Sequence, residues 1–110
     1  MITTHVLDTA AGRPGRGIAI ELERVEGTVW QLVGGGVTDD DGRLRTLTAQ
    51  GPVTPGTYRI RFQTGAYFTA NGQTGFFPVV EIQFVVHDGA QHYHVPLLLS
   101  PYGFSTYRGS

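Results

Sequence analysis

The sequence predicts an all-β domain, a sandwich of two sheets with about eight short strands and one short helix. Two observations predict the class. Apolar and polar residues alternate over short runs, and clusters of Gly, Pro and Asp separate these runs. The 110 residues are enough for one hydrophobic core and too few for two, so residues 1–110 are expected to form a single domain.

The first half of the chain contains four expected strands. They cover residues 1–9, 18–25, 28–37 and 43–48. In the second of these, Ile18, Ile20 and Leu22 share one face, which alternation predicts to be buried. The glycines at 34–36 indicate a bulge or bend. The stretch TDDDG at 38–42 predicts a turn in which Asp side chains accept hydrogen bonds from nearby backbone N–H groups.

The second half contains four more expected strands and the helix. The strands cover residues 57–64, 77–87, 92–100 and 103–107. Tyr58, Ile60 and Phe62 are predicted to face inward. Residues 65–73 are the only stretch with a helical pattern, and DGAQ at 88–91 predicts a hairpin between the two strands that flank it.

Two strands are apolar on both faces, and each has histidine on its less apolar face. From residue 92 onward, the predicted core face carries Tyr93, Val95, Leu97 and Leu99. The opposite face carries His92, His94, Pro96, Leu98 and Ser100. In the first strand, Ile2, Thr4 and Val6 lie opposite Thr3, His5 and Leu7. A sheet of this kind is usually covered on its outer side, so we expect another subunit there.

The composition excludes several classes of function. Charged residues make up only 15% of the chain, and the net charge of −1 argues against a nucleic-acid or membrane partner. The absence of cysteine excludes disulfides, thiol nucleophiles and sulfur-ligated metals. The first ten residues lack the features of a signal peptide, which predicts a cytoplasmic protein, with periplasmic and peroxisomal locations left open.

Three side chains are candidates for chemistry. His5 and His94 carry imidazoles that can take up a proton near neutral pH, although a structural role is the alternative for each. The guanidinium of Arg43 suits a planar anionic ligand, and a plain surface arginine is the alternative. A zinc site formed by His92, His94 and His5 is conceivable, but no carboxylate shares their face, and we expect no metal and no cofactor.

Two stretches of the sequence resemble a known family. The segments THVLDTAAGRPGRG at 4–17 and YHVPLLLSPYGFSTYRGS at 93–110 are similar to signatures of the transthyretin-like family, in its branch of 5-hydroxyisourate hydrolases. The order of strands and the single helix fit as well, so the resemblance spans nearly the whole chain. Residues 107–110, Tyr-Arg-Gly-Ser, are the most specific element.

The resemblance implies the residues of the site and the assembly. The implied catalytic residues are His5, Arg43 and His94. The implied substrate-binding residues, in the same pocket, are Tyr107, Arg108, Gly109 and Ser110. It further implies a homotetramer, a dimer of dimers with the sites in the channel between dimers.

The implied reaction is the hydrolysis of 5-hydroxyisourate to 2-oxo-4-hydroxy-4-carboxy-5-ureidoimidazoline in urate degradation. Water would attack the six-ring carbonyl, with one of the two histidines as general base and Arg43 positioning the substrate; which histidine is the base stays open. One alternative is a non-enzymatic carrier of a planar small ligand in the same channel, and another is a structural module. The ionisable residues favour the enzyme.

Overall fold

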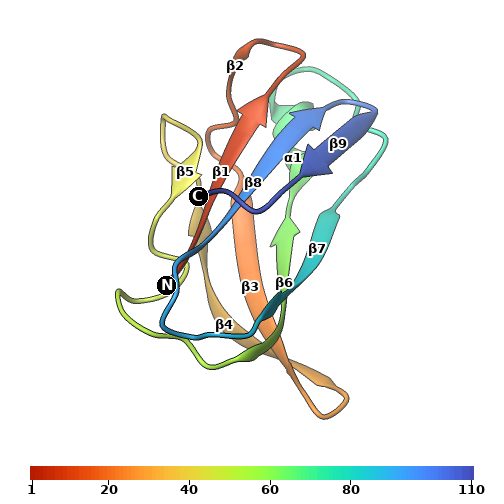
Figure 1. The fold of residues 1–110 in the computed structure, drawn as a ribbon. Helices are drawn as coiled ribbons and strands as arrows, with labels where there is room; N and C mark the ends of the chain where they lie inside the picture. Colours follow the sequence, from red (N-terminus) through yellow and green to blue (C-terminus); the bar gives the residue numbers. More distant parts are fainter.

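The computed structural model describes all residues, 1–110, as two sheets packed face to face with one helix at the end of the second sheet (Figure 1). The first sheet contains β1 (Ile2–Asp8), β2 (Arg13–Pro14), β5 (Arg43–Leu44), β8 (Tyr93–Ser100) and β9 (Gly103–Thr106). The second contains β3 (Ala19–Glu26), β4 (Val29–Val37), β6 (Gly56–Phe62) and β7 (Val80–Val86), and helix α1 spans Thr64–Ala70. This helix, the only one, is too short to cross a membrane.

The strand order of the first sheet brings distant parts of the chain together. The order is β2-β1-β8-β9, and β5 also pairs with β1. Strands β1 and β8 run parallel, with Thr3 opposite His94 and His5 opposite Pro96. On its other edge, β1 pairs with β5, where His5 lies opposite Arg43. The second sheet is antiparallel throughout, in the order β4-β3-β6-β7.

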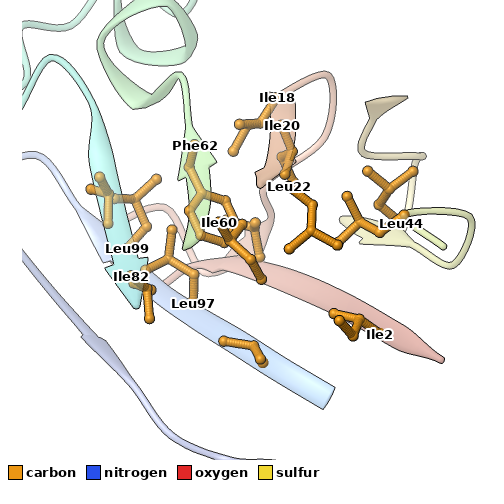
Figure 2. Packing of buried hydrophobic residues seen from close by; sticks show 14 of the residues in the cluster. Ile2, Ile18, Ile20, Leu22, Leu44, Ile60, Phe62, Ile82, Leu97 and Leu99 are labelled. Carbon is orange, nitrogen blue, oxygen red and sulfur yellow. The ribbon is translucent and has the colours of Figure 1, made fainter. Parts of the chain in front are cut away.

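The core lies between the two sheets, as the predicted alternation requires. Figure 2 shows aliphatic and aromatic side chains from both sheets meeting there, among them Ile2, Ile60 and Leu97, each with no exposed surface. The inward positions predicted for the strands that begin at residues 18, 57 and 92 are all buried. They are Ile18, Ile20, Leu22, Tyr58, Ile60, Phe62, Tyr93, Val95, Leu97 and Leu99.

The prediction of a hairpin at 88–91 is wrong. Strand β7 pairs with β6 in the second sheet, whereas β8 pairs with β1 and β9 in the first, so this segment crosses between sheets. The local turn does form, because the Asp88 carboxylate accepts a hydrogen bond from the N–H of Ala90 at 3.0 Å. Turn chemistry is the same for a hairpin and a crossover, so the local signal does not show which sheet the next strand joins.

Three further differences concern β5, β2 and the bulge in β4. The strand expected over 43–48 is only two residues long, and the chain then forms a loop that buries Leu47. The short strand β2 was not expected at all. The predicted bulge in β4 exists, but it lies at Val33, where the register shifts opposite Leu22 and Glu23. The next residue, Gly34, must be small, because a Cβ there would lie 2.0 Å from the backbone oxygen of Leu47.

Candidate active site

The three predicted catalytic residues lie on three adjacent strands at one end of the first sheet. His5 is on β1, Arg43 on β5 and His94 on β8, and each is half-buried. Strand β1 lies between β5 and β8, so His5 on β1 lies between Arg43 on β5 and His94 on β8. The pairing of three segments therefore brings together residues that are far apart in the sequence.

The acidic turn fixes the position of Arg43. One carboxylate oxygen of Asp39 accepts hydrogen bonds from the N–H groups of Asp41 and Arg43, each at 2.9 Å. The Arg43 N–H is the main reason that the pKa of Asp39 lies below its ordinary value. Gly42 has φ of +76°, and a Cβ there would lie 2.3 Å from the carbonyl oxygen of Val6. Only glycine fits this close approach of the turn to β1.

The same turn orients His5. Its Nε2 lies 2.9 Å from the backbone oxygen of Asp41. A carbonyl oxygen only accepts hydrogen bonds, so Nε2 carries the proton and donates it. In the neutral ring this leaves the lone pair on Nδ1.

A hydroxyl group connects His94 with His92, the residue just before β8. Oγ1 of the buried Thr3 lies 2.8 Å from Nδ1 of His94 and 2.7 Å from Nε2 of His92. The other ring nitrogen of His94, Nε2, has no hydrogen-bond partner within the chain. It is therefore the atom of this ring that is free to bind water or a ligand.

The surroundings of His94 favour its neutral form. Burial is the largest cause of its lowered pKa, followed by the positive charge of Arg43 and the neighbouring His92 and His5. A pKa below the usual value of about 6.5 means that the ring is neutral at pH 7. A neutral imidazole with a free nitrogen can accept a proton.

Arg43, His92 and His94 border a polar cavity of about 280 Å³, whereas His5 is not among its lining residues. Its lining includes Thr3, Arg43, Arg45, Gln50, His94 and Ser110. The guanidinium of Arg43 forms no salt bridge and donates no hydrogen bond within the chain. The cavity thus offers an unpaired cation and a neutral imidazole to a small anionic molecule.

Residues 107–110 divide between two cavities. The N–H of Gly109 donates to the carbonyl of His94 at 2.8 Å, and a Cβ on Gly109 would lie 2.7 Å from Cδ2 of that ring. The segment crosses in front of β8 toward β1 and β5 (Figure 1), and Ser110 borders the polar cavity. Tyr107 and Arg108 instead line a second cavity of about 470 Å³ beside β7.

Arg108 is held in that second cavity by two contacts. Its guanidinium lies 4.3 Å from the centre of the Tyr93 ring and donates to Oε1 of Gln91 at 2.9 Å. Tyr107 is more than half exposed. Within one chain, therefore, only Gly109 and Ser110 of the four predicted substrate-binding residues lie with the catalytic candidates.

No group of three His, Asp or Glu side chains is close enough together to hold a metal ion. The Thr3 hydroxyl lies between His92 and His94 and contacts a ring nitrogen of each. Sequence reasoning placed Thr3 on the histidine face but gave it no role. The signal that was missing is the parallel register of β1 and β8, which sets Thr3 opposite His94.

Known proteins resemble this chain over its whole length. The sequence model of the HIUase/Transthyretin family matches residues 2–109. A 5-hydroxyisourate hydrolase of Halalkalibacterium halodurans is 46% identical, and the alignment covers 99% of this chain and 97% of that protein. One from Pseudomonas aeruginosa is also 46% identical, with 99% and 90% covered.

Solved structures of two kinds share the fold. A 5-hydroxyisourate hydrolase of Klebsiella pneumoniae has a TM-score of 0.85 at 37% identity, covering 99% of this chain and 98% of that one. A transthyretin of Sparus aurata has a TM-score of 0.91 at 33% identity, covering 98% and 95%. The predicted transthyretin-like sandwich is confirmed, and the backbone fold alone does not separate the two kinds of protein.

Proposed function

The chain belongs to the HIUase/Transthyretin family, and from this membership and the polar site we propose that it hydrolyses 5-hydroxyisourate to 2-oxo-4-hydroxy-4-carboxy-5-ureidoimidazoline. One observation supports the enzyme most directly. A neutral His94 with a free Nε2 shares a cavity with the unpaired guanidinium of Arg43. Hydrolysis of a cyclic amide needs these two elements: a base for water and a positive charge for the developing oxyanion.

We propose His94 as the general base. Water bound at its Nε2 gives up a proton to the ring while its oxygen attacks the six-ring carbonyl carbon of the substrate. The carbonyl oxygen becomes an oxyanion, which Arg43 stabilises. When this tetrahedral intermediate collapses, the C–N bond breaks, the ring nitrogen takes up a proton, and a carboxylate is left.

His5 has the supporting role in this proposal. Its Nε2–H is occupied by the carbonyl of Asp41, so the ring is held at the edge of the site with Nδ1 as an acceptor. From there it orients the attacking water or a donor group of the substrate. Gly109 and Ser110 complete the wall next to His94. The assignment of Tyr107 and Arg108 to substrate binding stays a prediction, since both face the second cavity in one chain.

The assembly proposed for the active protein is a homotetramer, a dimer of dimers. The outer face of β1 and β8 supports a tetramer. Beside the histidines it carries Leu7 and Leu98, both half-buried, where a solvent-facing sheet would carry polar side chains. A second subunit would cover this face and close the cavity. Sedimentation equilibrium would report four times the mass of one chain, and a monomer would contradict the proposal. A cytoplasmic location likewise stays a prediction.

The polarity of the cavity argues against the alternative function, a carrier of a planar small ligand. A sea bream transthyretin in complex with thyroxine matches the fold at a TM-score of 0.92. A carrier of a planar apolar ligand needs a largely apolar channel. Here the cavity is bordered by Arg43, Arg45, Gln50 and His94, which favours a reactive, anionic substrate.

The test is the decay of freshly generated 5-hydroxyisourate, followed by ultraviolet absorbance with wild-type protein, with His94→Ala and with buffer alone. Wild type should accelerate the decay, and His94→Ala should lower kcat by about 10²–10⁴-fold, the usual contribution of a positioned base. Decay at the buffer rate in both proteins would contradict the enzyme. Equal acceleration by both would leave the activity but remove His94 as the base.

A further inference from the structure

The hydroxyl of Thr3 imposes a condition on the two histidines that it contacts. It has one hydrogen to donate, and it lies within hydrogen-bond distance of both Nδ1 of His94 and Nε2 of His92. When both contacts are hydrogen bonds between neutral groups, the hydroxyl donates to one ring and accepts an N–H from the other. The protonation of His94 at Nδ1 is thereby tied to that of His92 at Nε2.

This coupling decides whether His94 can act as a base. If the Thr3 hydroxyl donates to His92, then His94 donates its Nδ1–H to Thr3 and has its lone pair on Nε2, ready for a proton. If the hydroxyl donates to His94 instead, the proton of that ring sits on Nε2, and the ring is a donor. Reversing the hydrogen bonds of the Thr3 hydroxyl therefore switches Nε2 of His94 between a proton acceptor and a hydrogen-bond donor.

The charges around His94 favour movement of a proton from His94 to His92. Taking up a proton at Nε2 makes His94 an imidazolium beside Arg43, with Arg45 on the same cavity and His5 on the neighbouring strand. Burial disfavours that charge further. His92 borders the same cavity but precedes β8 and is exposed in one chain, so water solvates a positive charge better on its ring than on that of His94.

We propose that Thr3 and His92 form a proton relay between His94 and solvent, an inference that rests on the proposed function. After Nε2 of His94 accepts the proton of water, its Nδ1–H passes to Oγ1 of Thr3, and the Thr3 hydroxyl proton passes to Nε2 of His92. His92 then releases its Nδ1 proton to bulk water. One proton has left the site, and His94 is neutral with its proton on Nε2, which it can give to the leaving ring nitrogen only as its Nδ1 takes a proton back.

The relay closes once the product forms. When His94 gives its Nε2 proton to the leaving nitrogen, the Thr3 hydroxyl returns a proton to Nδ1 of His94. Nε2–H of His92 replaces it on the hydroxyl, and His92 takes up a proton from solvent at Nδ1. No other reactant is needed, and Thr3 acts through His94 as a positioning residue.

The experiment compares Thr3→Val with Thr3→Ser and His92→Gln. Valine keeps the shape of threonine without the hydroxyl, serine keeps the hydroxyl, and glutamine can bond to Thr3 but cannot titrate. Thr57→Val, in the second sheet, is the matched control, because the Thr57 hydroxyl has no hydrogen bond within the chain.

We expect Thr3→Val and His92→Gln each to lower kcat by about 10–100-fold with little change in KM, and Thr3→Ser to restore most of it. In mixtures of light and heavy water, wild type should show more than one proton in flight and both variants only one. Imidazole buffer should rescue His92→Gln in part.

A readout independent of activity separates the relay from the proposed function. Nitrogen chemical shifts of the His94 ring should show Nδ1 and Nε2 tautomers in exchange in wild type and a single tautomer in Thr3→Val. Unchanged shifts and wild-type kcat in both variants would overturn the relay while leaving the hydrolase intact. If Thr3→Val does not fold, the exposed His92→Gln variant decides alone, and wild-type kcat with several protons in flight would overturn the relay.

Discussion

The outer faces of the two sheets handle charge in opposite ways. On the second sheet, Arg59 lies 2.8 Å from Glu23 and 3.4 Å from Glu81, and its guanidinium stacks 4.3 Å from the centre of the Trp30 ring. On the first sheet, Arg43 lies beside two histidines and has no carboxylate partner. Arg43 and Arg59 are both half-buried, and they differ in the charges that surround them.

The difference separates charges that support the fold from charges available for chemistry. A guanidinium paired with carboxylates has its positive charge neutralised, and it has little left for a ligand. An unpaired one keeps its charge and also depresses the pKa of a nearby imidazole, as Arg43 does for His94. In this sandwich the paired guanidinium of Arg59 lies on one outer face, and the unpaired guanidinium of Arg43 lies on the face that carries the histidines.

The largest effects are expected when one arginine is neutralised on each outer face, which tests whether Arg43 serves activity and Arg59 serves stability. Arg43→Gln should lower kcat/KM by about 10²–10³-fold, because the oxyanion loses its cation, and should leave the free energy of unfolding within about 0.5 kcal/mol. Arg59→Gln should do the reverse, keeping activity and losing about 1–3 kcal/mol, since Glu23 would stay half-buried without its partner. Substrate decay and urea unfolding measure the two quantities. Equal effects of the two substitutions would show that the faces do not differ in role.

The pH dependence sharpens the contrast further. If neutral His94 is the base, kcat should be constant between pH 7 and 8 and should fall only below about pH 6.5, by about tenfold per unit beyond its lowered pKa. The same lowered pKa affects stability. Below about pH 6.5 the unfolded chain binds a proton that folded His94 does not, so the free energy of unfolding should decrease as the pH falls through that window.

A rate profile and urea unfolding between pH 5 and 8 check both parts. His94→Gln should flatten the part of the stability slope that this group contributes, whereas His87→Gln, outside the site, should leave it unchanged. A rate that is still constant at pH 5 would mean that protonation of His94 does not limit the reaction, which would contradict its role as the base.

The smallest expected effect comes from the segment that covers His94. Gly109→Ala would place a methyl group about where the ring now packs, so His94 or the segment must shift. We expect kcat to fall by about tenfold, as a misplaced catalytic group would cause, with little loss of stability. Gly103→Ala in β9 is the matched control, because its nearest neighbour would lie 3.8 Å away. Wild-type kcat in Gly109→Ala would mean that the contact has no role in positioning the ring.

Alternation along single strands could be predicted from the sequence, and pairing between strands could not. The faces of β1 and β8 follow from residue parity, which correctly separates Val95 and Leu97 in the core from His94 on the outside. The crossover at 88–91 looked like a hairpin because Asp88 and Gly89 form the same local turn in both. Register is a long-range property, so the contact of Thr3 with both histidines was hidden as well.

The candidate site was predictable to a similar extent. His5, Arg43 and His94 were candidates from their side-chain chemistry, the resemblance implied their catalytic roles, and the fold brings them onto adjacent strands. Residues 107–110 came from the same resemblance, but the sequence has no signal for the direction of each side chain in that segment. Stacking of Arg108 on Tyr93 depends on a neighbouring strand and becomes visible only in three dimensions.

The parallel pairing of β1 with β8 also has a consequence for how the protein is made. Strand β1 is synthesised well before its parallel neighbour β8, because 91 residues separate Thr3 from His94. Contacts so distant along the chain form slowly and late in folding. Half-folded chains therefore hold the two histidines apart, so hydrolytic activity and completion of the first sheet are expected to arise in the same step.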